Sequence, residues 1–114
     1  MNDVFRLNER DTEYVFMIAM DSKCNPTGFF EISHGTVNLS LISPREIIIK
    51  ALLSNAVNVV LIHNHPSGCS IPSTDDFNIT KRLKEAFLLV GLNFCDHIII
   101  AENEYCSFAE EKLL

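Results

Sequence analysis

The chain has 114 residues, of which 47% are apolar and 21% charged, the balance of a folded globular protein and not of a disordered one. Its apolar runs fall well short of the roughly 20 residues that a membrane-spanning helix needs. Nine Lys plus Arg against fifteen Asp plus Glu give a formal net charge of −6, so the chain lacks the basic excess typical of nucleic-acid binders. The length predicts one domain, residues 1–114, whose core does not depend on disulfides or metal.

The first half of the chain predicts a series of strands. Residues 13–20 (EYVFMIAM) are rich in aromatic and β-branched side chains and precede a turn-forming stretch, DSKCNP, which indicates a strand followed by a hairpin. Residues 28–33 and 35–42 continue as two further strands.

Two helices are indicated by their start signals. The string SPRE at 43–46 places serine as the cap, proline at the first helical position and glutamate three residues after the cap, and this helix should extend to about Asn55. A second helix begins at Ser73 and ends near Gly91. Its apolar positions follow helical spacing: Phe77, Leu83, Ala86, Phe87 and Val90.

The remaining segments complete an α/β (α+β) fold. Residues 58–62 (NVVLI) fit a buried central strand that ends at His63. Residues 65–72 (HPSGCSIP) contain two prolines and a glycine and therefore form a loop. A last strand covers the isoleucine-rich residues 93–101. Together these elements predict a curved, mostly antiparallel or mixed sheet with helices packed on its faces.

The N-terminal stretch and the spacing of the cysteines indicate the cellular compartment in which we expect the protein. The segment MNDVFRLNERDTE is charged and has no apolar centre of the kind found in secretory signals, so we expect a cytoplasmic protein. The four cysteines are widely spaced and include no C-x-x-C pair: Cys24, Cys69, Cys95 and Cys106. This spacing argues against a zinc ribbon or a thioredoxin-like site and favours free thiols in a reducing compartment.

A candidate metal site follows the central strand. His63 and His65 are separated by one residue, and on extended backbone this spacing puts both rings on the same side. Asp76, in the first turn of the next helix, can complete a set of two histidines and one aspartate. Such a set leaves one tetrahedral position for water, which is typical of a catalytic zinc site.

Each part of this pattern also has a plainer interpretation. His63 and His65 could be ordinary surface residues of a loop. Ser73 and Asp76 could form a capping box at the start of the helix and nothing more. Capping and metal binding are compatible, however, because one carboxylate oxygen can accept from the backbone while the other faces an ion.

The same residues carry a family resemblance. His63-x-His65, seven residues, then Ser73-x-x-Asp76 resembles the JAMM (MPN+) metalloprotease motif in order and spacing. The strings HNHPSG and DHIII, with SPRE upstream, are similar to those of the bacterial RadC family over most of the chain. The resemblance implies a JAMM/MPN-like (cytidine-deaminase-like) fold. It also implies zinc as cofactor, with His63, His65 and Asp76 as its ligands and the Ser73 hydroxyl steadying the oxyanion.

The resemblance further implies an upstream glutamate that hydrogen-bonds the zinc-bound water and carries its proton. Glu13, which opens the first predicted strand, is the preferred candidate. Glu31 on the second strand is its rival, and Glu46 comes third because it is expected to cap a helix. Asn64 should point away from the metal and secure the turn. The Asp96-His97 pair could contact the metal ligands or bind a second metal, although a structural hydrogen bond is the plainer interpretation.

Three functions are compatible with these observations. The first is a zinc-dependent metallohydrolase, a peptidase or isopeptidase acting on a protein or peptide. The second is a non-catalytic MPN-type interaction module. The third is a DNA-repair-associated protein, the historical description of RadC, against which the acidic charge balance argues. An exposed sheet edge near the C-terminus would allow copies to pair into a homo-oligomer.

Overall fold

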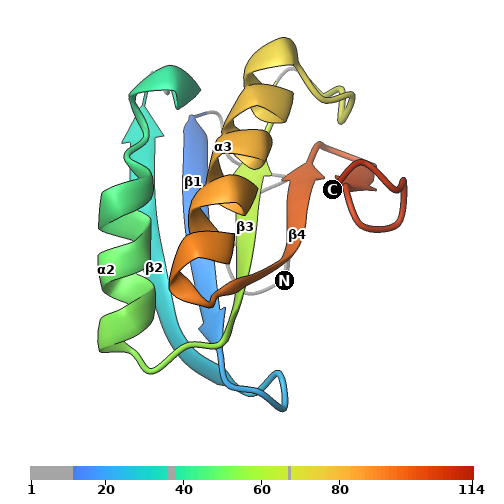
Figure 1. Cartoon of the computed structure of the whole chain (residues 1–114). Coiled ribbons are helices and arrows are strands. Elements are labelled where there is room, and N and C mark those ends of the chain that lie inside the picture. The colour runs from blue at the N-terminus through green and yellow to red at the C-terminus, as the bar shows by residue number, and fades with distance from the viewer. Residues whose placement is uncertain (1–11, 36–37, 67) are drawn as a thin grey trace.

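The structure, a computed structural model, describes residues 12–35, 38–66 and 68–114, and over these ranges the strands form one five-stranded sheet (Figure 1). The sheet has the order β2-β1-β3-β4-β5. All of its pairs are antiparallel except β3 with β4, so the sheet is mixed, as predicted. The strands are β1 (Glu13–Met20), β2 (Pro26–Gly35), β3 (Asn58–Asn64), β4 (Asn93–Ile100) and β5 (Tyr105–Ser107).

Both helices, α2 (Pro44–Leu53) and α3 (Thr74–Val90), cover the same face of the sheet (Figure 1). Alternation along β1 explains this arrangement, because residues two apart point to one side. The odd-numbered β1 residues meet apolar residues of both helices in the main core, which includes Val15, Met17, Ala19, Ile47, Ala51, Leu61, Ile79, Leu83 and Phe87. We expected a mixed sheet with helices packed against it, and this is confirmed; among the described residues both helices lie on one face.

A second apolar cluster lies on the opposite face of the sheet. It consists of the even-numbered residues of the central strands together with the end of β4: Phe16, Ile18, Val60, Ile62 and Ile100. Burial on both faces accounts for the uninterrupted apolar run NVVLI in β3, since a strand with one solvated face would alternate. No helix in the described ranges is both long and apolar enough to cross a membrane.

Three details differ from the sequence-based expectations. The strand predicted at 35–42 is wrong in the described part of that range: β2 ends at Gly35, whose φ of +95° leaves the extended region, and Leu39–Leu41 form a 3-10 turn, η2. Residues 36–37 lie outside the described residues. Ser43 is the N-cap of α2, but its side chain makes no capping hydrogen bond. The short strand β5 was not predicted, because three residues carry too little pattern.

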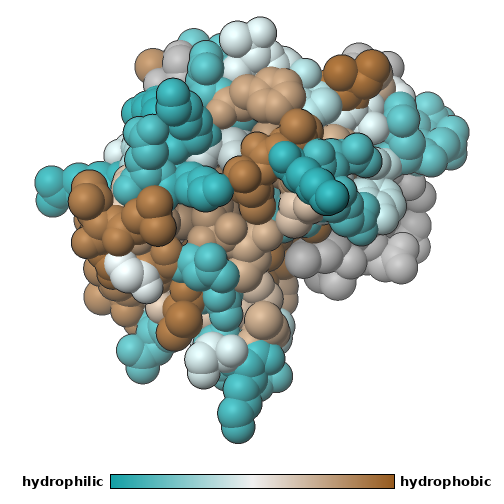
Figure 2. All heavy atoms as spheres, turned by 45° about the vertical axis from the view of Figure 1, so that its right-hand side comes forward, coloured by the Kyte–Doolittle hydropathy of each residue, from teal (hydrophilic) through white to brown (hydrophobic). Residues whose placement is uncertain are grey.

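Some apolar residues of the helices face solvent. Of the positions expected in the core of α3, Leu83 and Phe87 are buried, whereas Phe77 and Val90 are more than 40% exposed. Figure 2 shows apolar residues on this side of the molecule in patches interrupted by hydrophilic ones. Helical spacing thus located the buried stripe, but it made that stripe too wide.

Gly91 ends α3 in the left-handed conformation, with φ 78° and ψ 21°. We expect Gly91→Ala to lower the free energy of unfolding by about 1 kcal/mol, because an L-residue with a Cβ is strained there. A Cβ at this position would meet nothing within 4 Å, so the cost comes from the backbone alone. Urea denaturation measures it. Gly91→Asn is the control, since asparagine tolerates this conformation and should retain most of the stability.

Candidate metal centre

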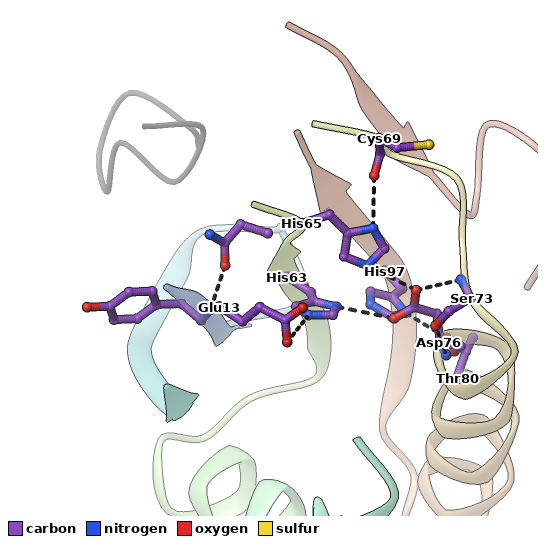
Figure 3. Close-up of polar contacts among 10 residues, drawn as sticks. Glu13, His63, His65, Cys69, Ser73, Asp76, Thr80 and His97 are labelled. Carbon is purple, nitrogen blue, oxygen red and sulfur yellow. Dashed lines mark hydrogen bonds and ion pairs between the residues drawn. The ribbon is translucent and has the colours of Figure 1, made fainter. Parts of the chain in front are cut away.

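Three polar side chains point to the helix-covered face at the end of the sheet where α3 begins (Figure 3). In β1, Glu13 continues the series of odd-numbered residues that face the helices, and in the register of the sheet Val15 lies opposite His63. His97 on β4 lies opposite Leu61 of β3, another residue of the main core. Glu13, His63 and His97 therefore come from three adjacent strands to one place.

His65 follows the end of β3 but keeps the extended course of the strand. Its backbone N–H donates to the Ile100 carbonyl at 2.8 Å, which prolongs the pairing of β3 with β4 by one step. The rings of His63 and His65 consequently share a side, with centroids 4.8 Å apart. His65 Nδ1 lies 3.0 Å from the Cys69 carbonyl oxygen, an acceptor, so this nitrogen carries the hydrogen and Nε2 faces the site.

Asp76 joins the two histidines to the start of α3. Its Oδ1 lies 3.2 Å from His63 Nδ1, and its Oδ2 lies 3.2 Å from His65 Nε2. The Ser73 backbone N–H donates to Oδ2 at 2.8 Å, while Ser73 Oγ accepts from the Asp76 N–H at 3.1 Å. The capping box and the approach to the histidines thus exist together, because the carboxylate has two oxygens and is completely buried.

The charges at these groups follow from their contacts. Burial by itself raises the pKa of the Asp76 carboxyl, but hydrogen bonds with His63, His65 and Ser73 outweigh it and hold that pKa well below its usual range. The hydrogen bond with Asp76 raises the pKa of His65, against the effect of partial burial. Burial lowers the pKa of His97 to about 3, so this ring is neutral at physiological pH.

A cation fits among these atoms, because the described side chains around Asp76 offer more hydrogen-bond acceptors than donor hydrogens. Nε2 of His65 and Oδ2 of Asp76 lie 3.2 Å apart, and both can donate lone pairs to a positive ion that replaces the hydrogen between them. Nε2 of His63 and Nε2 of His97 are buried without a hydrogen-bond partner among the described residues. Imidazole nitrogens and a carboxylate oxygen form a donor set that suits zinc.

The ligand atoms converge in a way that the sequence did not predict. Among the described residues, the set whose ligand atoms all lie within 4.8 Å of one another is His63, Asp76 and His97. His65 approaches the other oxygen of Asp76. The three expected ligands, His63, His65 and Asp76, therefore lie around one carboxylate, and His97 lies beside them.

Glu13 is the upstream glutamate that reaches this place. Its Oε2 lies 3.9 Å from His63 Nε2, and its side chain is 36% exposed. Glu31 is paired with Phe16, which faces away from the helices, and its Oε2 lies 3.0 Å from His34 Nδ1 on the exposed surface. Glu46 is exposed in the first turn of α2. The geometry favours Glu13 over both alternatives.

Asn64 binds the backbone at the start of β1. Its Oδ1 accepts from the Tyr14 N–H and its Nδ2 donates to the Thr12 carbonyl at 3.0 Å, so it holds the backbone on both sides of Glu13. That it also secures the turn after β3 stays a prediction. Asp96 matches the plainer interpretation: its carboxylate binds the His97 and Ala109 N–H groups and the Ser107 hydroxyl.

The chain is similar to known proteins over nearly its whole length. The profile of the RadC-like JAB domain matches residues 2–113. The chain belongs to the RadC-like JAB domain family. This family is part of the JAMM/MPN superfamily, and the mixed sheet with its two helices is consistent with that fold.

RadC-family relatives are similar over nearly the whole chain. A UPF0758 protein of Pelobacter propionicus is 40% identical over an alignment of 114 positions that covers 98% of this chain and 50% of the relative. UPF0758 proteins of Clostridium acetobutylicum and Clostridium perfringens are 38% and 41% identical, covering 96% and 90% of this chain and 48% and 45% of the relatives. The chain thus spans about half the length of the curated relatives it matches. Their names state no reaction.

The RadC-like motif residues line a cavity of about 370 Å³, a size in the range of small-ligand sites. Its wall includes Glu13, His63, His65 and Ser73 from the motif, together with Leu39, Cys69, Ile71 and Asp75. Sequence reasoning missed Thr80, whose hydroxyl binds both the Asp76 carbonyl and His97. Its spacing of four residues from Asp76, one helical turn, could have indicated it.

We expect Asn64→Ala to lower the free energy of unfolding by about 1–3 kcal/mol, because it removes two partly buried hydrogen bonds, to the Tyr14 N–H and the Thr12 carbonyl, each contributing about 0.5–1.5 kcal/mol. Hydrogen exchange at the Tyr14 amide should become faster in the same variant, which shows that the loss is local to the start of β1. Asn78→Ala, at an exposed position of α3, is the matched control and should change stability by less than about 0.5 kcal/mol. Unchanged protection of Tyr14 in Asn64→Ala would contradict the assignment.

Proposed function

We propose that this chain is a zinc-dependent hydrolase that cleaves amide or isopeptide bonds in a protein or peptide substrate. The observation that carries the proposal is the approach of His63 and His65 to the two oxygens of the buried Asp76 carboxylate, next to a cavity that Glu13 and Ser73 also line. A structural zinc site would use its ligands to hold a core, whereas here the apolar core is complete without them.

His63, His65 and Asp76 would hold the ion. When bound, zinc supplies Lewis-acid chemistry: it lowers the pKa of water toward neutrality and polarises a carbonyl. The His65 Nδ1–H bond to the Cys69 carbonyl fixes the tautomer that leaves Nε2 for the ion, as is usual for metal-binding histidines. The Ser73 N–H bond similarly fixes the Asp76 carboxylate.

The proton is handled by Glu13. Hydrolysis forms a bond from a water oxygen to the substrate carbonyl carbon and breaks the carbon–nitrogen bond. The proton that the water loses must reach the departing nitrogen. Glu13 Oε2 is near His63 and open to the cavity, so it can accept the proton as general base and return it as general acid.

Ser73 can steady the charge that develops on the carbonyl oxygen. Its Oγ accepts from the Asp76 N–H, so the hydroxyl hydrogen can donate to an oxyanion. The helix start adds to this, because the positive end of the α3 dipole points toward the cavity. Capping and catalysis therefore use different atoms of the same residue.

We expect the purified protein to contain one zinc per chain, and His65→Ala to lose it while staying folded, because the core does not include this side chain. Elemental analysis and circular dichroism measure the two effects. His34→Ala is the control, since His34 is an exposed histidine on β2 that pairs with Glu31. If chelation unfolds the wild-type protein outright, the ion is structural and the catalytic proposal fails.

We expect Glu13→Gln to keep zinc and fold but to lower hydrolysis by about 10²- to 10⁴-fold, because the proton acceptor is lost while the ion remains. A mixture of quenched-fluorescent peptides with backbone and lysine isopeptide linkages provides the assay. Glu31→Gln is the matched control on the opposite face of the sheet and should retain full activity. Equal rates for Glu13→Gln and wild type would remove Glu13 from the mechanism. Zinc-loaded wild type without hydrolysis would instead favour a non-catalytic interaction module.

A further inference from the structure

His97 is a fully buried histidine in the interior beside the candidate metal centre (Figure 3). Its ring stacks on Phe108, with centroids 4.7 Å apart, and lies 6.4 Å from the His63 ring at an interplanar angle of 23°. Thr80 on α3 holds its Nδ1 at 2.7 Å. The ring is thus fixed on one side by packing and on another by a hydrogen bond.

The direction of that hydrogen bond can be deduced. Thr80 Oγ1 lies 2.8 Å from the Asp76 carbonyl oxygen, which only accepts, so the single hydroxyl hydrogen of Thr80 goes there. His97 Nδ1 must then donate its own hydrogen to Thr80 Oγ1. This tautomer leaves Nε2 as a lone pair.

The Nε2 lone pair of His97 is buried and has no hydrogen-bond partner among the described residues. A buried acceptor without a partner is destabilising, so a purely structural role leaves this nitrogen of His97 unexplained. A ligand atom of His97 lies within 4.8 Å of ligand atoms of both His63 and Asp76. An ion bound by His63 and Asp76 would therefore lie within reach of the His97 ring.

We propose that His97 Nε2 is an additional nitrogen donor of the metal centre, reaching the ion from the interior of the protein beside His63 and Asp76. The inference rests on the proposed function, because it requires that the site bind zinc. It would enlarge the donor set of His63, His65 and Asp76 by a third imidazole, which Thr80 holds in the ligating tautomer. The water of the proposed hydrolysis would then enter as a fifth ligand, a coordination number that catalytic zinc can adopt. The expected consequence is tighter zinc binding than three side chains alone provide.

The test removes one nitrogen, Nε2 of His97, and keeps the contact with Thr80. In His97→Asn the amide nitrogen can take the place of Nδ1 and keep the Thr80 contact, but no atom replaces Nε2. We expect its Kd for Zn²⁺, measured by competition with a chromophoric chelator, to rise by at least 10-fold. The visible absorption of the Co²⁺-loaded protein should also change, since this band reports the ligand set. His34→Asn, the same change at the exposed histidine, should leave both readouts unchanged.

A measurement on the wild-type protein keeps the inference testable if His97→Asn does not fold. Titration with Zn²⁺ while recording the ¹⁵N resonances of the histidine side chains should move Nε2 of His97 along with the nitrogens of His63 and His65. If only the resonances of His63 and His65 move, or if His97→Asn binds Zn²⁺ and Co²⁺ like wild type, the inference is wrong and the proposed function stands. If the wild-type protein binds no Zn²⁺, both fail.

Discussion

The arrangement of the candidate site depends on a single buried carboxylate. Asp76 lies in the first turn of α3, where it forms the capping box with Ser73. Its carboxylate also contacts His63 near the end of β3. A completely buried aspartate is costly unless its oxygens are satisfied, and here both oxygens have nitrogen neighbours. The histidines give the buried carboxylate at the start of α3 its nitrogen partners. The same carboxylate, fixed by the start of the helix, contacts both histidines.

Much of this could be predicted from the sequence, since short-range patterns determine it. The apolar runs of β1 and β3, rich in aromatic and β-branched residues, and the spacing of His63 and His65 are local properties, and they give the right strands and the shared side of the two rings. The start of α3 and its end at Gly91 follow from capping signals in the same way. The family resemblance then added the expected roles of Glu13 and Ser73.

What could not be predicted depends on contacts between distant segments. Whether two helices share a face of the sheet depends on connections that no local pattern encodes. Helical spacing likewise does not tell which apolar residues at the edge of the α3 stripe are buried, and Phe77 and Val90 are exposed. The place of His97 depends on the parallel pairing of β4 with β3 and on Thr80 one turn after Asp76. Glu13 and Glu31 could not be separated until the register of β1 against β2 placed them on opposite faces.

The hydrogen bonds of the Asn64 side chain restrict insertions and deletions at the start of β1. By binding Thr12 and Tyr14 it aligns β1 against β3 just where backbone pairing ends. A slip of one residue would turn every side chain of β1 to the opposite face, moving Glu13 out of the cavity and an uncharged neighbour into it. An insertion or deletion between Thr12 and Val15 would therefore turn Glu13 away from His63, so the spacing of these residues is constrained by the hydrogen bonds of Asn64.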